Sequence, residues 1–171
     1  MKFPERFSNL PAYAFPRLRT LLDSHPSGGD VVHMTIGEPK HAFPAWVTDV
    51  ITEHAAGFNN YPPNEGIPEL RSAFCDWLAR RYGVDVDADA HVMPLNGTRE
   101  GLYNAGMALC PPDTNVLVPN PFYSVYGVAA KAAGAEPHYI PALAENGFLP
   151  DFAGLPAKTL DKTSIVYMCS P

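Results

Sequence analysis

Apolar side chains recur every three or four positions in the first half of the chain, which is the period of a helix with one buried face. The clearest stripe predicts a helix over residues 68–82, opened by Pro68 and ended by Gly83. Its apolar members are Ile67, Leu70, Phe74, Trp77 and Leu78. We expect the basic residues off this stripe to form a solvated face: Arg71, Arg80 and Arg81.

Shorter patterns of the same period predict helices at residues 15–25, 45–56, 98–110 and 124–133. Apolar runs predict strands at residues 91–95, 115–119, 136–141 and 164–168, and residues 31–36 are expected to be extended. Strands that alternate with helices form parallel sheets covered by those helices. The sequence therefore predicts an α/β fold with a largely parallel sheet.

The stretch Asn96-Gly97-Thr98-Arg99-Glu100-Gly101 joins a predicted strand to a predicted helix. Unpaired N–H groups and the dipole at a helix N-terminus favour an anion. The Thr98 hydroxyl and the Arg99 guanidinium would add donors for a phosphate. The alternative is an ordinary turn in which Thr98 caps the helix and Glu100 is exposed. For this stretch alone, the ordinary turn is the simpler interpretation.

Ligands of parallel α/β sheets bind beyond the carboxyl ends of the strands. The turns at residues 96–99 and 119–123 and the final residues 169–171 occupy that position. Tyr123 could meet a ligand there, or it could be a core aromatic at a strand end. In earlier turns, Gly37 permits close approach of a ligand and the Tyr61 hydroxyl could donate to one. Their alternatives are a plain turn and an aromatic that covers its own loop.

Composition narrows the function classes. The chain has 171 residues, of which 46% are hydrophobic and 18% charged, as expected for a globular protein. A net charge of -6 argues against a nucleic-acid partner, which normally meets a basic face. No apolar stretch resembles a signal core or approaches the length of a membrane span.

Cysteine and histidine usage gives no framework for disulfides or metals. Three cysteines without paired spacing favour a reduced, cytoplasmic compartment. The six histidines are scattered, so we expect no metal site. The chain stops directly after the predicted strand at residues 164–168, which would leave that strand uncovered. We therefore expect the chain to be the N-terminal part of a longer protein.

Five short motifs follow one another along the chain. They are Gly37-Glu38-Pro39, Tyr61 with Gly66 and Leu70-Arg71 behind it, Asn96-Gly97-Thr98-Arg99-Glu100, Pro119-Asn120-Pro121-Phe122-Tyr123 with Tyr126, and Cys169-Ser170-Pro171. Over residues 30–171 this ordered set resembles the class I and II aminotransferases, which are pyridoxal-phosphate enzymes of fold type I. Within that family it is similar to the proteobacterial succinyldiaminopimelate transaminases.

The resemblance implies an architecture and a cofactor site. Residues 1–45 would form an N-terminal arm and small-domain segment, and residues 46–171 would begin the large domain that binds pyridoxal phosphate. The residues that would hold the cofactor phosphate are Gly97, Thr98 and Arg99. Tyr123 would stack on the pyridine ring of the cofactor.

The same resemblance implies a homodimer with shared active sites. Tyr61 would reach the cofactor phosphate of the neighbouring subunit, and Gly37 would lie near the substrate carboxylate. The Schiff-base lysine of the family is expected beyond Pro171, so this piece alone is expected to be inactive. The lysines that are present are expected to be surface charges: Lys40, Lys131, Lys158 and Lys162.

The implied reaction exchanges an amino group between an amino acid, such as glutamate, and a 2-oxo acid, with the cofactor as electron sink. The narrower similarity implies N-succinyl-LL-2,6-diaminopimelate as substrate, in lysine biosynthesis. Two alternatives stay open. One is another fold type I enzyme, such as a C–S lyase or a different aminotransferase. The other is a truncated, non-catalytic α/β module that binds phosphate. A Rossmann-type dinucleotide site is disfavoured, because the turn lacks G-x-G-x-x-G spacing.

Overall fold

The computed structural model describes residues 4–8, 10 and 12–170. Pro171, the last residue of the predicted terminal motif, lies outside them. The described residues form two compact units, one within Met1–Pro26 and Leu95–Pro171 and the other within Ser27–Pro94. We call the first the sheet unit and the second the helical unit.

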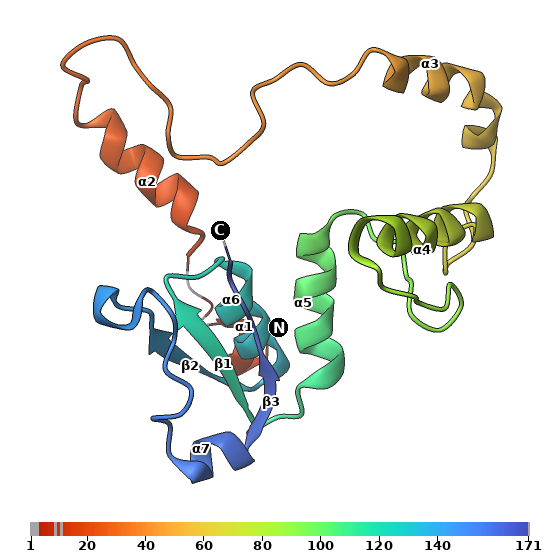
Figure 1. Ribbon diagram of the computed structural model, residues 1–171. Helices are drawn as coiled ribbons and strands as arrows, with labels where there is room; N and C mark the ends of the chain where they lie inside the picture. The colour runs from red at the N-terminus through yellow and green to blue at the C-terminus, as the bar shows by residue number, and fades with distance from the viewer. Residues whose placement is uncertain (1–3, 9, 11, 171) are drawn as a thin grey trace. The chain divides into compact units, whose positions relative to one another are not determined.

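Three parallel strands form the centre of the sheet unit (Figure 1). β1 (Asn115–Asn120) lies between β2 (Glu136–Pro141) and β3 (Thr163–Val166). β1 is buried along all but its last residue, because it has a hydrogen-bonded neighbour on both sides. Such a strand reads as a continuous apolar run in the sequence. The predicted α/β fold with a parallel sheet is confirmed.

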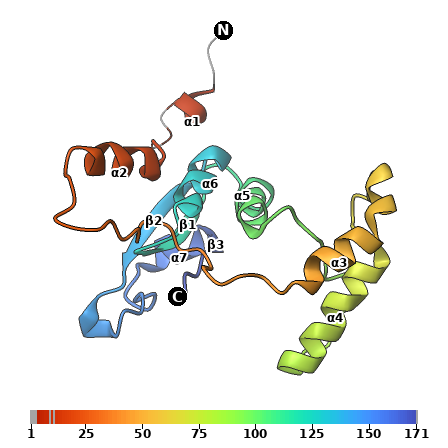
Figure 2. The same ribbon diagram turned by 90° about the horizontal axis from the view of Figure 1, so that it is seen from above.

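Two helices pack against each other and onto one face of this sheet (Figure 2). They are α5 (Thr98–Leu109) and α6 (Val125–Ala133), both close to their predicted ranges. A Cβ atom at Gly106 of α5 would lie 2.9 Å from the Cβ atom of Ala129 of α6, so small residues set this close approach. The core under α6 includes Val116 and Val118 of β1.

The remaining elements of the sheet unit are short. The N-terminal segment contains α1 (Glu5–Ser8), which contacts α6, and α2 (Ala14–Asp23), the predicted amphipathic helix. In the sequence, β2 is followed by a 3-10 turn, η2 (Ala144–Asn146), and then by α7 (Ala157–Asp161), which precedes β3.

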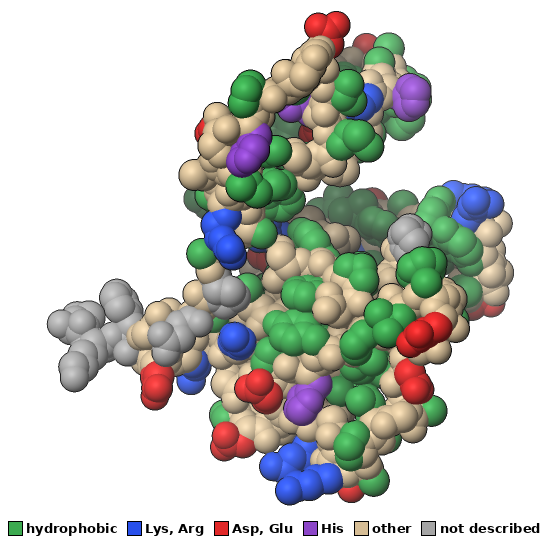
Figure 3. Space-filling view, turned by 90° about the vertical axis from the view of Figure 1, so that its left-hand side faces the viewer, with side chains coloured by type: hydrophobic (Ala, Val, Ile, Leu, Met, Phe, Trp, Pro, Cys, Tyr) green, Lys and Arg blue, Asp and Glu red, His purple; other side chains and the backbone are tan. Residues whose placement is uncertain are grey.

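The sheet unit leaves an apolar surface beside its edge strand β2. Figure 3 views this side, and hydrophobic side chains gather on it. Three residues that follow β2 are between 49% and 71% exposed: Leu143, Phe148 and Leu149. Contiguous apolar surface of this kind is typical of places where further protein packs.

The helical unit contains α3 (Trp46–Glu53), the 3-10 helix η1 (Ala55–Asn59) and α4 (Pro68–Tyr82). α4 has its predicted bounds. Pro68 needs no helical N–H partner in the first turn, and Gly83 ends the helix with a φ of 66°. Helix α3 stops three residues before the predicted end at Ala56, where the chain tightens into η1.

The strand predicted at residues 91–95 is wrong, whereas residues 31–36 are predicted only to be extended. The run at residues 91–95 and the segment at residues 31–36 contain no regular strand. Pro94 has no N–H to donate to a sheet ladder, and Met93 beside it is 68% exposed. Val32 and Met34 are more exposed still. Apolar residues alone do not form a strand where no neighbouring strand pairs with them.

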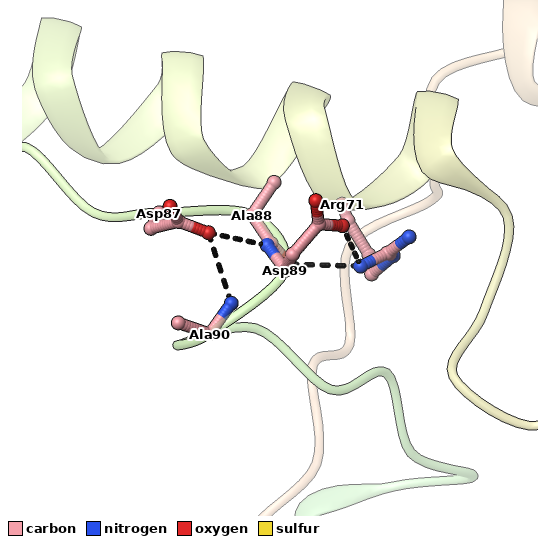
Figure 4. Close-up of polar contacts among 5 residues, drawn as sticks. All are labelled: Arg71, Asp87, Ala88, Asp89 and Ala90. Atoms are coloured by element: carbon pink, nitrogen blue, oxygen red, sulfur yellow. Dashed lines mark hydrogen bonds and ion pairs between the residues drawn. The ribbon is translucent and has the colours of Figure 1, made fainter.

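Arg71 corrects another prediction, because it is buried rather than solvated. Only 8% of its surface is exposed, on the side of α4 that faces residues 87–90 (Figure 4). Its Nη1 donates to the backbone oxygen of Ala88 at 3.1 Å and to the Asp89 carboxylate at 2.6 Å. Arg71 therefore ties this loop to the helix. Its Nε atom is buried without a hydrogen-bond partner among the described residues.

Candidate functional site

The start of α5 has an open backbone. Gly97 occupies the cap position with φ 96° and ψ 144°, a region that residues with a side chain rarely adopt. A Cβ atom added there would meet no atom within 4 Å, so the space above the helix start is free. Thr98 is the first helical residue and not the cap, which corrects the predicted turn. Glycine takes the cap position because only it adopts this backbone readily.

The first-turn N–H groups of α5 are not consumed by a capping side chain. The Glu100 carboxylate instead reaches back and accepts a hydrogen bond from the Asn96 N–H at 3.1 Å. Thr98 is exposed, and its hydroxyl makes no hydrogen bond with the described residues. The helix start thus presents N–H groups and a hydroxyl to solvent. These are the donors that a phosphate would need.

Arg99 lies between two tyrosine rings. Its Nη1 donates to the Tyr13 hydroxyl at 3.2 Å, and its guanidinium carbon lies 5.1 Å from the Tyr13 ring centroid. The same carbon lies 6.0 Å from the ring centroid of Tyr123. The hydrogen bond with Tyr13 raises the pKa of Arg99 above its ordinary value, so the guanidinium stays charged. This positive charge offsets the Glu100 carboxylate beside the helix start.

Tyr123 follows the carboxyl end of β1, where ligands of parallel sheets bind. Its side chain is 39% exposed, which fits a ring with a free face better than a core aromatic. Because Arg99 contacts its ring, the structure brings Tyr123 to the start of α5. Four of the predicted site residues therefore lie together: Gly97, Thr98, Arg99 and Tyr123.

A cavity of about 900 Å³ lies beside this helix start. Its walls come from the N-terminal segment, α5, α6 and β2, and they include Tyr13, Arg99 and Tyr139. Thr98 and Tyr123 do not line it. The helix start is thus an open surface site. A partly apolar cavity lies next to it, and Arg99 belongs to both.

The other two predicted residues lie in the helical unit. Tyr61 is fully exposed, and a Cβ atom at Gly37 would meet nothing within 4 Å. Lys40 and Glu38, next to Gly37, form an exposed ion pair. The predicted roles of Tyr61 and Gly37 stay predictions.

The sequence motifs did not reveal three contacts of the site. Tyr13 is 86 positions from Arg99, and no local pattern links them. The Glu100–Asn96 hydrogen bond resembles half of a capping box, and a glutamate three positions after the cap was the available signal. Tyr126 is part of the fourth sequence motif, which assigns it no role. Its ring meets the Tyr123 ring edge-on, with centroids 5.9 Å apart.

Within residues 4–8, 10 and 12–170, no group of at least three His, Cys, Asp or Glu side chains is arranged to hold a metal ion. None of the helices in the described part of the chain is both long and apolar enough to span a bilayer.

The chain is similar to known proteins in sequence and in fold. The sequence model of the family "Aminotransferase class I and II" matches residues 29–171. The chain is 36% identical over 174 residues to an LL-diaminopimelate aminotransferase of Dehalococcoides mccartyi, covering 100% of this chain and 45% of the relative. The enzyme of the same name from Desulforudis audaxviator is 36% identical over 176 residues, again with 100% and 45% covered.

A solved structure is similar as well. A crystal structure of an aminotransferase from Neisseria meningitidis superposes with a TM-score of 0.89 at 34% identity, covering 99% of this chain and 44% of that one. The chain thus spans a little under half the length of the relatives that it matches. The match to the family covers most of the chain. The chain therefore belongs to the class I and II aminotransferases, a family of pyridoxal-phosphate-dependent enzymes.

Proposed function

We propose that the protein transfers an amino group between an amino acid and a 2-oxo acid, with pyridoxal phosphate bound at the start of α5. The observation that carries this proposal is the open helix start at Gly97–Thr98, with Arg99 and the ring of Tyr123 beside it. A phosphate there would replace solvent on N–H groups that no capping side chain satisfies.

Each residue has a distinct part in this proposal. The N–H groups at the helix start and the Thr98 hydroxyl bind the phosphate, and Arg99 supplies positive charge. Nη1 of Arg99 is engaged by Tyr13, and the guanidinium has further N–H donors for an anion. Tyr123 orients the cofactor ring by stacking. Bound pyridoxal phosphate supplies the electron sink for bonds broken at the amino-acid α-carbon.

The proposed substrate is an amino acid of the diaminopimelate type, with glutamate and 2-oxoglutarate as the other pair. Relatives that carry the name LL-diaminopimelate aminotransferase support this class. The sequence motifs favour the N-succinyl form instead. Both contain the diaminopimelate unit, and the N-succinyl form adds a succinyl group on one amino group, so we place the protein in lysine biosynthesis and leave the choice between the two forms to an assay. Amino transfer from each compound to 2-oxoglutarate distinguishes them, and β-elimination without transfer would indicate a C–S lyase.

The proposal includes a homodimer in which Tyr61 contributes to the phosphate site of the partner and Gly37 lies near the substrate carboxylate. Full exposure of Tyr61 supports a contact beyond its own subunit. The division at residues 1–45 and 46–171 and a cytoplasmic location are parts of the same proposal, the latter from the cysteine usage. Sedimentation of the purified protein tests the dimer, and a monomer at micromolar concentration would contradict it.

The phosphate site is tested by replacing Thr98→Val in the protein expressed from its complete reading frame. We expect the dissociation constant of pyridoxal phosphate to rise about tenfold, because a hydrogen bond to a charged group is lost. Affinity for pyridoxal, which lacks the phosphate, should stay within about twofold on the same reasoning. Thr20→Val, on the exposed surface of α2, is the matched control. Equal losses for both ligands would contradict a phosphate site at Thr98.

A further inference from the structure

Tyr126, in the first turn of α6, is held by two residues that directly follow β3. It is 5% exposed. Its hydroxyl donates to the backbone oxygen of Met168, just after β3, at 3.1 Å. Its ring stacks on that of Tyr167, with centroids 4.4 Å apart and planes inclined by 6°. Tyr167 is in turn fixed to α5, because its hydroxyl donates to the Leu102 oxygen at 2.7 Å.

These contacts leave Tyr126 little freedom to rotate. Rotation about its side-chain bonds would break either the stack or the hydrogen bond. Burial raises the pKa of Tyr126, so its hydroxyl remains a donor to Met168 well above neutral pH. The ring of Tyr126 is therefore a rigid part of the core that reaches the edge of the site.

Tyr123 differs, because it stands on the loop before α6 and is 39% exposed. Its ring meets the Tyr126 ring at 85°, with centroids 5.9 Å apart, which is a favourable edge-to-face arrangement. The backbone N–H of Tyr126 also donates to the backbone oxygen of Tyr123 at 3.1 Å, which closes the turn between the two residues. The guanidinium of Arg99 approaches the Tyr123 ring as well, at 6.0 Å.

We propose that Tyr126 is a positioning residue that fixes the ring plane of Tyr123, and so prepares that plane to receive the pyridine ring of the cofactor. The inference rests on the proposed function for its cofactor but not for its tyrosine geometry. An exposed ring without such support would populate several rotamers, and stacking would have to select one of them. A ring that is already oriented binds a flat ligand at a lower entropic cost.

The test compares Tyr126→Leu with Tyr126→Phe in the complete protein. Leucine removes the ring that Tyr123 meets, so we expect pyridoxal phosphate to bind about two- to tenfold more weakly, the range for loss of an aromatic pair. The circular dichroism band of the bound cofactor should weaken in parallel. Phenylalanine keeps the ring and the stack on Tyr167, so it should restore both to near the parent values.

Leu117→Ala is the control for general destabilisation. Leu117 is 1% exposed and lies outside the core cluster that contains Tyr126. This change should lower stability without altering the cofactor band or affinity. An equal loss of affinity in Leu117→Ala and Tyr126→Leu would overturn the proposal, as would unchanged affinity in Tyr126→Leu.

A measurement without cofactor separates this inference from the proposed function. Fluorine NMR of protein labelled with 3-fluorotyrosine, with Tyr123→Phe to assign the resonance, reports the order of the Tyr123 ring. We expect one sharp environment in the parent and averaged or multiple signals in Tyr126→Leu. If the ring is ordered by Tyr126 and pyridoxal phosphate does not bind, the proposed function fails and the positioning contact stands. If the cofactor binds and the Tyr123 signal is the same in both proteins, the positioning role fails alone.

Discussion

The two compact units have similar apolar patterns in sequence, but they differ in how far their apolar side chains are buried. Every described hydrophobic residue that is buried lies in the sheet unit, between Cys110 and Tyr167. In the helical unit the stripe on α4 is well formed, yet Leu70, Phe74 and Trp77 are each more than 40% exposed. The buried residue of α4 is Arg71. A helix can therefore carry the predicted period while its apolar face is only partly covered within its own unit.

The difference has a physical basis in the number of neighbours. β1 is flanked by two strands and covered by α6, so each of its apolar residues loses its contact with water. α4 meets the loop at residues 87–90 on its polar side, through Arg71. We infer that hydrophobic burial stabilises the sheet unit, while local hydrogen bonds and an ion pair organise the helical unit.

The largest expected effect comes from shortening the same residue type in both units. Leu117→Ala should lower the free energy of unfolding by about 2–5 kcal/mol, because it leaves a cavity in a close-packed sheet. Leu70→Ala, at a position that is 43% exposed, should cost about 1 kcal/mol. Urea unfolding of each variant measures both values. Equal losses would mean that the apolar stripe of α4 is covered in the protein in solution.

A second comparison uses two glycines that both face open space. Gly97→Ala should destabilise the protein by about 1–3 kcal/mol, because its φ of 96° is strained for any residue with a side chain. Gly57→Ala in η1 has no such φ and no atom within 4 Å, so it should change stability by less than about 0.5 kcal/mol. Thermal unfolding of the two variants checks this. A neutral Gly97→Ala would show that the helix start relaxes to another backbone.

Arg71 provides the next test, on the helical unit alone. Arg71→Met removes the contacts to Ala88 and Asp89 and should cost about 1–2 kcal/mol. The estimate is modest because Asp89 is highly exposed, so solvent screens the ion pair. Arg80→Met, on the same helix and exposed, should cost less than about 0.5 kcal/mol. Hydrogen exchange of the amides at residues 87–90 should quicken only in Arg71→Met.

Local patterns predicted most elements of both units. Periodicity and end signals located α4 from Pro68 to Gly83, and the apolar run at residues 115–119 located β1. These features depend on neighbours in sequence, so a single sequence contains them. The run at residues 91–95 was misjudged, because pairing with a second strand decides whether an apolar run becomes a strand.

The candidate site was predicted in outline for the same reason. Gly97 and Thr98 belong to one turn, and their donors follow from the helix start itself. The contacts of Arg99 with Tyr13 and of Arg71 with Asp89 join positions 86 and 18 apart. Such contacts depend on how the chain folds back on itself, and no spacing rule encodes them.

The smallest expected effect is a pH dependence within the helical unit. The Asp87 carboxylate accepts hydrogen bonds from the N–H groups of Ala90, at 2.9 Å, and Asp89, at 2.7 Å. These bonds hold the pKa of Asp87 below its ordinary value of 3.8. A depressed carboxyl pKa stabilises the folded loop above pH 3.8, and this stabilisation is lost as the pH falls through the folded-state pKa.

A carboxyl titration followed by NMR should therefore place the Asp87 pKa below 3.8 in the folded protein. Asp87→Asn keeps a side-chain acceptor but has no charge to titrate, so the protection of the Asp89 and Ala90 amides, relative to their intrinsic exchange rate at each pH, should lose its acid dependence. Asp85→Asn, two positions earlier, is the matched control and should leave that dependence intact. If acid opens the loop equally in the parent and in Asp87→Asn, the loop is held by Arg71 rather than by the Asp87 turn. The helical unit would then depend on a single side chain, whereas the sheet unit spreads its stability over a core.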